Sequence, residues 1–197
     1  KLKRRIAAIS VLHKLKGQYL DTKHPSIMEN LHGIKRTLGT RQKPKKPILI
    51  NDLKLIIKAI DEEKIRDKAL ILVGFSGGFR RSELVNIYYE DVEFVSEGVK
   101  ILIKRSKTDQ SGEGSIKAIP YFENKEFCPV VALKDYISEN FEIKNEGKVF
   151  KLSDKSVALI IKKYAEKAGL DASKYAGHSL RSGFATTAAE FGAEERN

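Results

Sequence analysis

The stretch KIRDKALILVGFSGGFRRSEL, residues 64–84, contains the elements that decide the fold. An apolar helix is expected over about 64–75, and its apolar run from Ala69 to Phe75 is far too short to cross a membrane. Gly77 and Gly78 predict a tight turn that ends the helix. A short second helix is expected over about 82–87, so the chain changes direction at the glycine pair.

Outward from this stretch, β-like and helical runs follow one another along the chain. Three β-like runs divided by Ser, Glu and Gly turns predict a small antiparallel meander: DVEFVSEG, VKILIKRSK and SIKAIPY. Helical spacing of apolar residues predicts helices over about 53–60 (capped by Asn51 or Asp52), 130–141, 153–168 and from 179 onward. The expected fold class is α+β, mainly α, with one small three-stranded antiparallel sheet.

The composition excludes several classes of protein. The chain has 197 residues, of which 41% are hydrophobic and 32% charged, which is typical of a globular domain with part of a second and not of a disordered chain. The single cysteine, Cys128, excludes an internal disulfide, so we expect a buried thiol and a reducing, cytoplasmic location. Four scattered histidines and the lack of a P-loop or dinucleotide motif predict neither a metal nor a cofactor.

The excess positive charge lies in the first quarter of the chain. Residues 1–48 hold 13 Lys and Arg against two acidic residues, and the resulting charge of +11 equals that of the whole chain. Such asymmetry favours a polyanionic partner such as nucleic acid, with a solvated basic face as the alternative. Apolar residues at helical spacing, including Ile27, Leu31 and Ile34, indicate that the basic residues lie on folded helices.

A stretch punctuated by Gly and Pro, LGTRQKPKKP, predicts a basic linker between two domains. We place the linker at residues 39–48, between a helical segment of residues 1–38 and a main domain of residues 49–197. Four of its side chains are candidate substrate-binding residues for a nucleic acid: Arg41, Lys43, Lys45 and Lys46.

Two arginines occupy the starts of helices, where the backbone dipole disfavours a cation by about 0.3 to 1 kcal/mol. Arg80 precedes the short helix after the glycine pair, and Arg181 lies in the first turn of the last helix, with Ser179 as the expected cap and His178 just before it. Free backbone N–H groups paired with Arg are what an anion site requires. The alternatives are arginines that reach solvent or pair with Glu83, and a histidine satisfied in the core.

These residues, with Lys107 at the end of a β run, resemble the motifs of a known family. Arg80 in FRRSEL, Lys107 in SKTD, and His178 with Arg181 in GHSLRSG resemble the Arg, Lys and His-x-x-Arg boxes of the tyrosine recombinases, the phage integrase family; the boxes are 27 and 71 residues apart. The resemblance implies a catalytic domain over residues 49–197, preceded by the C-terminal remnant of a helical core-binding domain.

The resemblance also implies a reaction and roles for the residues. Its substrate is a double-stranded DNA, which is cut and rejoined through a 3′-phosphotyrosyl intermediate without a metal or cofactor. Arg80 and Arg181 then bind the non-bridging oxygens of the scissile phosphate and stabilise the transition state, with Glu83 orienting Arg80. His178 assists proton transfer at the tyrosine, and Lys107 protonates the departing 5′ oxygen.

One part of the family pattern is not found. The nucleophilic Tyr is expected about thirty residues after the second Arg, whereas this sequence ends 16 residues after Arg181. We therefore expect a piece of a longer protein that does not cleave DNA by itself and is monomeric in isolation, whereas the family generally forms homo-tetramers on paired sites. The alternatives are a non-catalytic DNA-binding relative that keeps the phosphate pocket and, less well matched, a type IB topoisomerase.

Overall fold

The chain divides into two compact units, Lys1–Pro44 and Lys45–Asn197. The computed structural model describes residues 2–39, 45–104, 114–140 and 147–192. The second unit begins inside the linker that is predicted at residues 39–48.

The first unit contains two helices, α1 (Leu2–Leu15) and α2 (Pro25–Leu38). Pro25 stands at the first position of α2, where its missing N–H costs no hydrogen bond, and the His24 ring before it accepts from the Ser26 N–H. Apolar side chains of both helices line one shallow groove: Leu2, Ile6, Ile9, Ile27, Leu31 and Ile34. Within the described part of these helices only Leu31 is buried.

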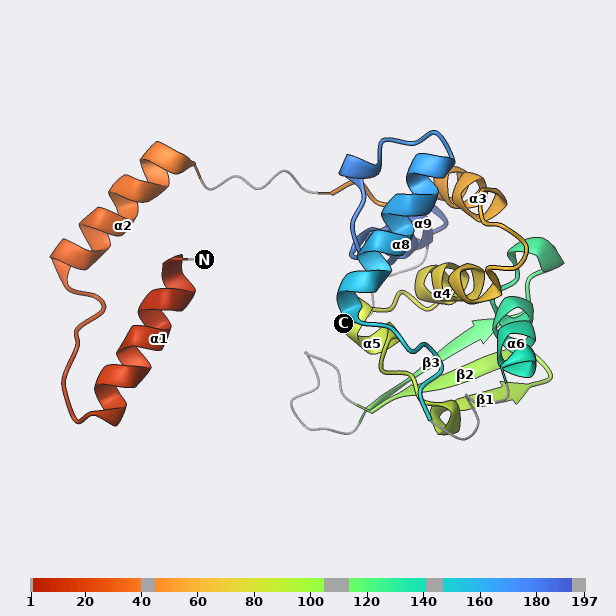
Figure 1. The fold of residues 1–197 in the computed structure, drawn as a ribbon, viewed down its shortest axis with the longest axis horizontal. Coiled ribbons are helices and arrows are strands. Elements are labelled where there is room, and N and C mark those ends of the chain that lie inside the picture. The colour runs from red at the N-terminus through yellow and green to blue at the C-terminus, as the bar shows by residue number, and fades with distance from the viewer. Residues whose placement is uncertain (1, 40–44, 105–113, 141–146, 193–197) are drawn as a thin grey trace. The chain divides into compact units, whose positions relative to one another are not determined.

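The second unit is built around α4 (Ile65–Ser76), whose residues from Ala69 to Phe75 are all buried. It packs against α6 (Pro129–Glu139) and α9 (Ser179–Glu190), while α3 (Ile50–Lys58) packs against α8 (Asp154–Lys167). Figure 1 shows these helices gathered on one side of the sheet. The predicted apolar helix is confirmed, and its run from Ala69 to Phe75 lies at the centre of the core.

The sheet is an antiparallel meander of β1 (Val92–Val95), β2 (Gly98–Ile103) and β3 (Ser115–Pro120), in that spatial order. In β2 the side chains at positions 99, 101 and 103 are buried, whereas those at 100 and 102 are exposed. One face of the sheet therefore packs on the helices and the other faces solvent. The predicted α+β class with a small three-stranded sheet is confirmed.

Short elements connect these parts of the second unit. α5 (Arg81–Leu84) follows a turn in which Gly78 adopts a φ of +57°, a left-handed conformation that favours glycine. Short 3₁₀ turns lie at Tyr89–Asp91, Lys125–Phe127 and Ala172–Lys174. The tight turn predicted at the glycine pair is confirmed.

The structure tests two further predictions from the sequence, the cap of α3 and the burial of Cys128. The predicted cap of α3 is wrong: Leu49 precedes the helix without a side-chain cap, so Asp52 lies within it and its carboxylate is available for other partners. Cys128 is fully buried, as predicted, and its Sγ accepts from the Phe122 N–H at 3.3 Å. Across the described ranges, no helix is long and apolar enough to span a membrane.

Candidate active site

The carboxylate of Glu83 binds Arg80 at two points. Arg80 stands immediately before α5, where its backbone N–H donates to Glu83 Oε2 at 2.9 Å and its Nη1 donates to Glu83 Oε1 at 2.7 Å. The Glu83 side chain is only 5% exposed, so this carboxylate is fixed by the core around it. Because both carboxylate oxygens bind the same residue, the guanidinium has one preferred direction, and Glu83 orients Arg80 as predicted.

Arg181, which lies 103 residues after Gly78 in the sequence, contacts the same turn. Its Nη1 donates to the carbonyl oxygen of Gly78 at 2.7 Å, two residues before Arg80. One helical turn further along α9, the Phe184 ring covers Gly78 so closely that an added Cβ would lie 2.7 Å from it. No carboxylate among the described residues pairs with Arg181. No described carboxylate therefore neutralises the charge of this guanidinium, which can bind an anionic ligand.

His178 stands next to Arg181 at the start of α9. It is the residue before the first helical position and its side chain is exposed, whereas Ser179, the predicted cap, lies inside the helix and accepts from the Ala176 N–H. The loop in front of it lies against Arg81, because a Cβ added at Gly177 would be 1.7 Å from Arg81 Cδ. The His-x-x-Arg segment and the segment around Arg80 thus pack directly on each other.

Three of the four predicted catalytic residues therefore belong to two segments in contact, 77–84 and 177–184. Lys107 lies outside the described residues. Among those described, no group of His, Cys, Asp and Glu has the arrangement of a metal site.

Lys117 of β3 is a further cation near this turn that no sequence pattern singles out. Burial lowers the pKa of Lys117 below the ordinary lysine value, and the positive charges of Arg181 and Arg80 lower it too, against the opposing effect of Glu83. Lys117 thus shares its electrostatic surroundings with both arginines and Glu83. A strand lysine usually points to solvent, and only the strand register reveals that this one does not.

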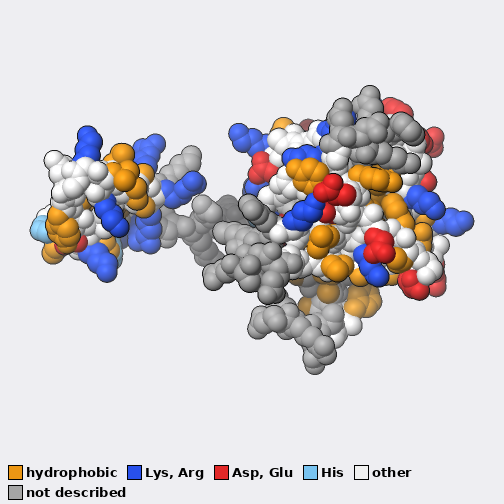
Figure 2. Space-filling model, turned by 90° about the horizontal axis from the view of Figure 1, so that it is seen from below, with side chains coloured by type: hydrophobic (Ala, Val, Ile, Leu, Met, Phe, Trp, Pro, Cys, Tyr) orange, Lys and Arg blue, Asp and Glu red, His pale blue; other side chains and the backbone are white. Residues whose placement is uncertain are grey.

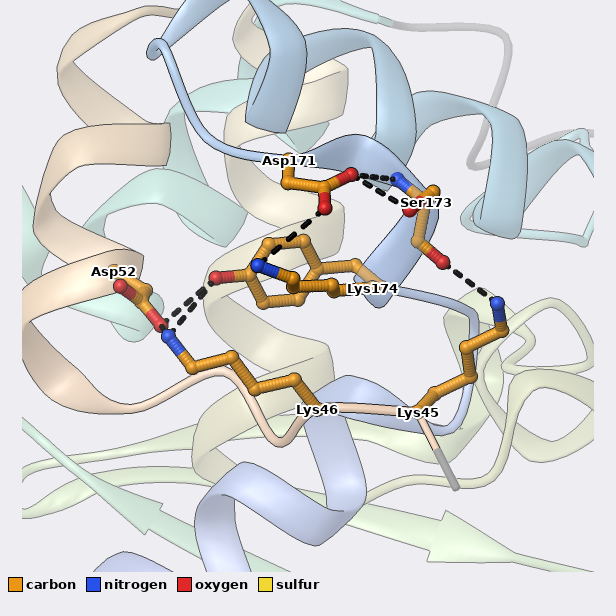
Figure 3. Close-up of polar contacts among 7 residues, drawn as sticks. Lys45, Lys46, Asp52, Asp171, Ser173 and Lys174 are labelled. Carbon is orange, nitrogen blue, oxygen red and sulfur yellow. Dashed lines mark hydrogen bonds and ion pairs between the residues drawn. The ribbon is translucent and has the colours of Figure 1, made fainter. Parts of the chain in front are cut away.

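The segment 45–48 runs beside the loop that leads into the His-x-x-Arg box. The Lys46 N–H donates to the Lys174 carbonyl at 2.8 Å, and the Ile48 N–H donates to the Ser179 carbonyl at 3.0 Å. Lys45 Nζ donates to the Ser173 carbonyl at 2.6 Å, as Figure 3 shows. We call residues 45–48 the strap. Sequence reasoning missed it because backbone hydrogen bonds leave no side-chain signature.

The Lys46 side chain joins a small polar cluster beside the strap. Its Nζ pairs with Asp52 Oδ2 at 2.8 Å, and the buried Tyr175 hydroxyl donates to the same oxygen at 2.9 Å (Figure 3). The hydrogen bond to Asp52 raises the pKa of Lys46, while burial and then the bond to Asp52 raise the pKa of Tyr175. The cluster therefore keeps both groups protonated at neutral pH and ties the strap to α3.

These contacts bear on the predicted nucleic-acid-binding residues of the linker. Lys45 and Lys46 use their ammonium groups inside the second unit, whereas Arg41 and Lys43 lie outside the described residues. Contact of all four residues with a nucleic acid stays a prediction. On the visible face of the first unit, at the left of Figure 2, Lys and Arg side chains greatly outnumber acidic ones.

The sequence model of the phage integrase family matches residues 46–197, which is most of the chain. The chain belongs to the phage integrase family. It is 46% identical to an "Integrase/recombinase xerD homolog" of Selenomonas ruminantium, over 95% of this chain and 60% of that protein. It is also 31% identical to "Tyrosine recombinase XerA" of Pyrococcus horikoshii, over 77% of this chain and 50% of that protein. The chain thus spans between half and three fifths of the length of these relatives.

Solved structures of this family share the fold. A crystal structure of XerA recombinase superposes with a TM-score of 0.61 at 21% identity, covering 96% of this chain and 69% of that one. A pre-cleavage complex of the XerH site-specific recombinase bound to its difH substrate also gives a TM-score of 0.61, at 17% identity and over 79% and 46% of the two chains. The predicted tyrosine recombinase fold is therefore confirmed.

Proposed function

We propose that the protein is a site-specific DNA recombinase that breaks and rejoins strands through a 3′-phosphotyrosyl intermediate. The observation that carries the proposal is the meeting of Arg80 and Arg181 at one glycine turn, beside the buried carboxylate of Glu83. A site with surplus positive charge beside a buried Glu attracts an anion, and Arg binds phosphate oxygens in two-point geometry.

In this reaction the two arginines are held by different groups and bind the same phosphate. Arg80 is aimed by Glu83, and Arg181 is aimed by the Gly78 carbonyl, so both guanidinium groups are oriented before DNA arrives. Donors that are fixed in advance stabilise the extra charge of a pentacoordinate phosphate without reorganising. His178 would assist proton transfer at the nucleophile, and Lys107 would protonate the departing 5′ oxygen.

The tyrosines of the core do not serve as the nucleophile. The hydroxyls of Tyr136, Tyr164 and Tyr175 are buried and donate to Val149 O, Asp67 and Asp52 respectively, at 2.9 to 3.1 Å. Burial and the bond to Asp67 strongly raise the pKa of Tyr164, which opposes formation of the attacking phenolate. We propose that the 197 residues alone do not cleave DNA and that the reaction needs a nucleophilic Tyr from elsewhere.

Double-stranded DNA is the proposed partner of both units. The basic first unit supplies phosphate contacts that position the duplex, and such contacts carry no sequence information by themselves. We also propose homo-tetramers on paired sites for the complete recombinase, a monomer for the isolated chain, and action in the cytoplasm. The XerH complex with its difH substrate supports a DNA partner by family likeness.

Covalent capture of DNA tests the proposed reaction. Labelled duplexes of pooled sequence, each with a nick close to the cleavable bond, trap a recombinase as a covalent adduct. We expect an adduct with the complete protein, none after Arg80→Ala, and none with the 197-residue chain. DNA binding without any adduct by the complete protein would instead support a non-catalytic relative that keeps the phosphate pocket. An adduct with the 197-residue chain would contradict the proposal and implicate one of its own tyrosines.

A further inference from the structure

Lys117 lies on the buried face of the sheet. In the antiparallel register it stands opposite Ile101, and two residues further along β3 lies Ile119. Both isoleucines are buried, at 0% and 1% exposure, whereas Ile116 on the other face is 66% exposed. Since side chains alternate along a strand, the Lys117 side chain extends toward the helical layer.

The neighbouring helix brings Arg181 to the same place. Ala118 and Ile119 of β3 line one groove together with Phe184 and Thr187 of α9. Arg181 is three residues before Phe184 and shares its face of α9. On the α5 side, Glu83 and Ile103 line one pocket, and Ile103 stands opposite Ser115, two residues before Lys117 on the same face of β3. Lys117 thus lies on β3 between a residue that borders the Glu83 pocket and residues that border the Phe184 groove, and the charges of Arg181 and Arg80 act on it.

The position is electrostatically unfavourable for a lysine without a ligand. No hydrogen bond or ion pair joins the Lys117 ammonium to any residue within the described ranges. The nearby charged groups are Arg181 on α9, and Arg80 and Glu83 beside and within α5. Among the described residues, these three cations lie around one carboxylate, that of Glu83, and like charges at close range repel each other. A bound anion with several oxygens would relieve this repulsion.

We propose that Lys117 is a third cation of the phosphate site and binds a non-bridging oxygen of the DNA phosphate beside Arg80 and Arg181. This inference rests on the proposed function and adds to it a substrate-binding residue ten positions beyond Lys107. Lys117 comes from a regular strand, so the sheet fixes its position relative to the two helix starts. Its role is to bind the phosphate charge, while Lys107 keeps the predicted proton transfer.

Inorganic phosphate is the probe, with the 197-residue chain as the protein. The pKa of Lys117, followed by NMR of ¹³Cε-labelled lysine, is expected to rise by about one unit when phosphate is added, because an anion favours the ammonium form. Lys117→Arg, which removes the resonance, assigns it. A Lys117 pKa that is unchanged at saturating phosphate would overturn the proposal.

Affinity and stability together separate binding from a structural role. Lys117→Met is expected to weaken phosphate binding about tenfold or more in calorimetric titration, while Lys117→Arg keeps most of it. The same Lys117→Met change should leave the midpoint of thermal unfolding unchanged or higher, since it removes a repelled cation. Lys100→Met, an exposed lysine on the opposite face of the sheet, is the matched control and should change neither. Reduced stability with full phosphate affinity would contradict the inference.

Arg181→Ala distinguishes failure of this inference from failure of the proposed function. If Arg181→Ala abolishes phosphate binding and Lys117→Met does not weaken it, the site stands and Lys117 is no part of it. If neither change affects phosphate binding, the inference and the proposed phosphate site both fall. Losses from both changes, with Lys100→Met unaffected, support the inference.

Discussion

The two units of this chain differ in net charge and in the size of their buried core. The first 44 residues hold 11 Lys and Arg against two acidic residues, yet their two helices bury one side chain, Leu31. Residues 45–197 hold 26 basic and 24 acidic residues around a core built on α4. The first unit thus carries most of the net charge on helices with little buried core. The second unit has a large buried core and nearly equal numbers of basic and acidic residues.

For the proposed binding of DNA, this difference predicts a division of labour between the two units. Charges on exposed helices attract a duplex through many weak phosphate contacts. Chemistry at one phosphate instead requires a few cations whose positions are fixed by packing, as Glu83 fixes Arg80 and Gly78 receives Arg181. Affinity should therefore depend on the number of charges in the first unit, and reactivity on the geometry of the second.

The largest expected effect separates reactivity from affinity. In the complete protein, Arg181→Ala should lower the rate of strand cleavage about 10² to 10³-fold, because a preorganised donor to the transition state is lost. Binding to a long duplex should fall only slightly, since one of many phosphate contacts is removed. Single-turnover cleavage and gel-shift titration on the same DNA measure the two quantities. Equal losses in both would contradict the proposed division.

The same substitution in the two units should have opposite effects on stability. Gly183→Ala in α9 would place a Cβ 2.0 Å from the Ile48 carbonyl oxygen of the strap and should lower the free energy of unfolding by about 3 kcal/mol. Gly33→Ala in α2 meets no atom within 4 Å and should stabilise that helix by about 1 kcal/mol. Urea unfolding followed by tyrosine fluorescence reports the first, and amide hydrogen exchange in α2 the second. A neutral Gly183→Ala would mean that the strap does not support α9.

A buried hydroxyl tests the rigidity of the second unit. Tyr164→Phe removes the bond to Asp67 and should lower the free energy of unfolding by about 2 kcal/mol at pH 7, whereas the exposed Tyr121→Phe should have no effect. The pKa of Tyr164 is raised in the folded state, so folding holds this proton where the unfolded chain releases it. The contribution of Tyr164 to stability should therefore be fully present below about pH 10 and be lost above it, so the alkaline loss of stability should be less steep in Tyr164→Phe. An identical alkaline loss in both proteins would contradict this assignment.

The smallest expected effect lies in the first unit. Neutralising Lys3, Arg4 and Arg5 of α1 with Gln should reduce the slope of log affinity against log salt by about 0.9 for each residue that contacts a phosphate. The matched control neutralises three exposed lysines of the second unit: Lys54, Lys134 and Lys155. Fluorescence anisotropy with a labelled duplex measures the slopes. A larger change from the control would place the main DNA-binding surface on the second unit.

The sequence predicts most of the fold and part of the site, for identifiable reasons. The apolar run at 69–75 and the period-two runs near 92–120 carry their burial pattern locally, so the core helix and the meander follow from them. The boxes that contain Arg80 and Arg181 are recognisable from their local sequences. Lys117 is not, because its direction depends on the register against Ile101, which tertiary packing decides.

The strap is a second feature that the sequence alone does not predict. Its basic residues and Pro47 predict part of a linker, but the backbone N–H groups of Lys46 and Ile48 donate to the carbonyls of Lys174 and Ser179. Asp52 likewise has the sequence of a helix cap and instead accepts hydrogen bonds from Lys46 and Tyr175. In each case a contact more than a hundred residues away along the chain overrides the local preference.

A crystal structure of the chain with tungstate, a heavy-atom analogue of phosphate, tests the central claim most directly. The claim is that Arg80 and Arg181, which lie far apart in sequence, hold the same tetrahedral oxyanion. One tungstate within hydrogen-bond distance, about 3 Å, of both guanidinium groups is the predicted result. Tungstate bound to each arginine separately, or guanidinium groups that face away from each other, would contradict the account.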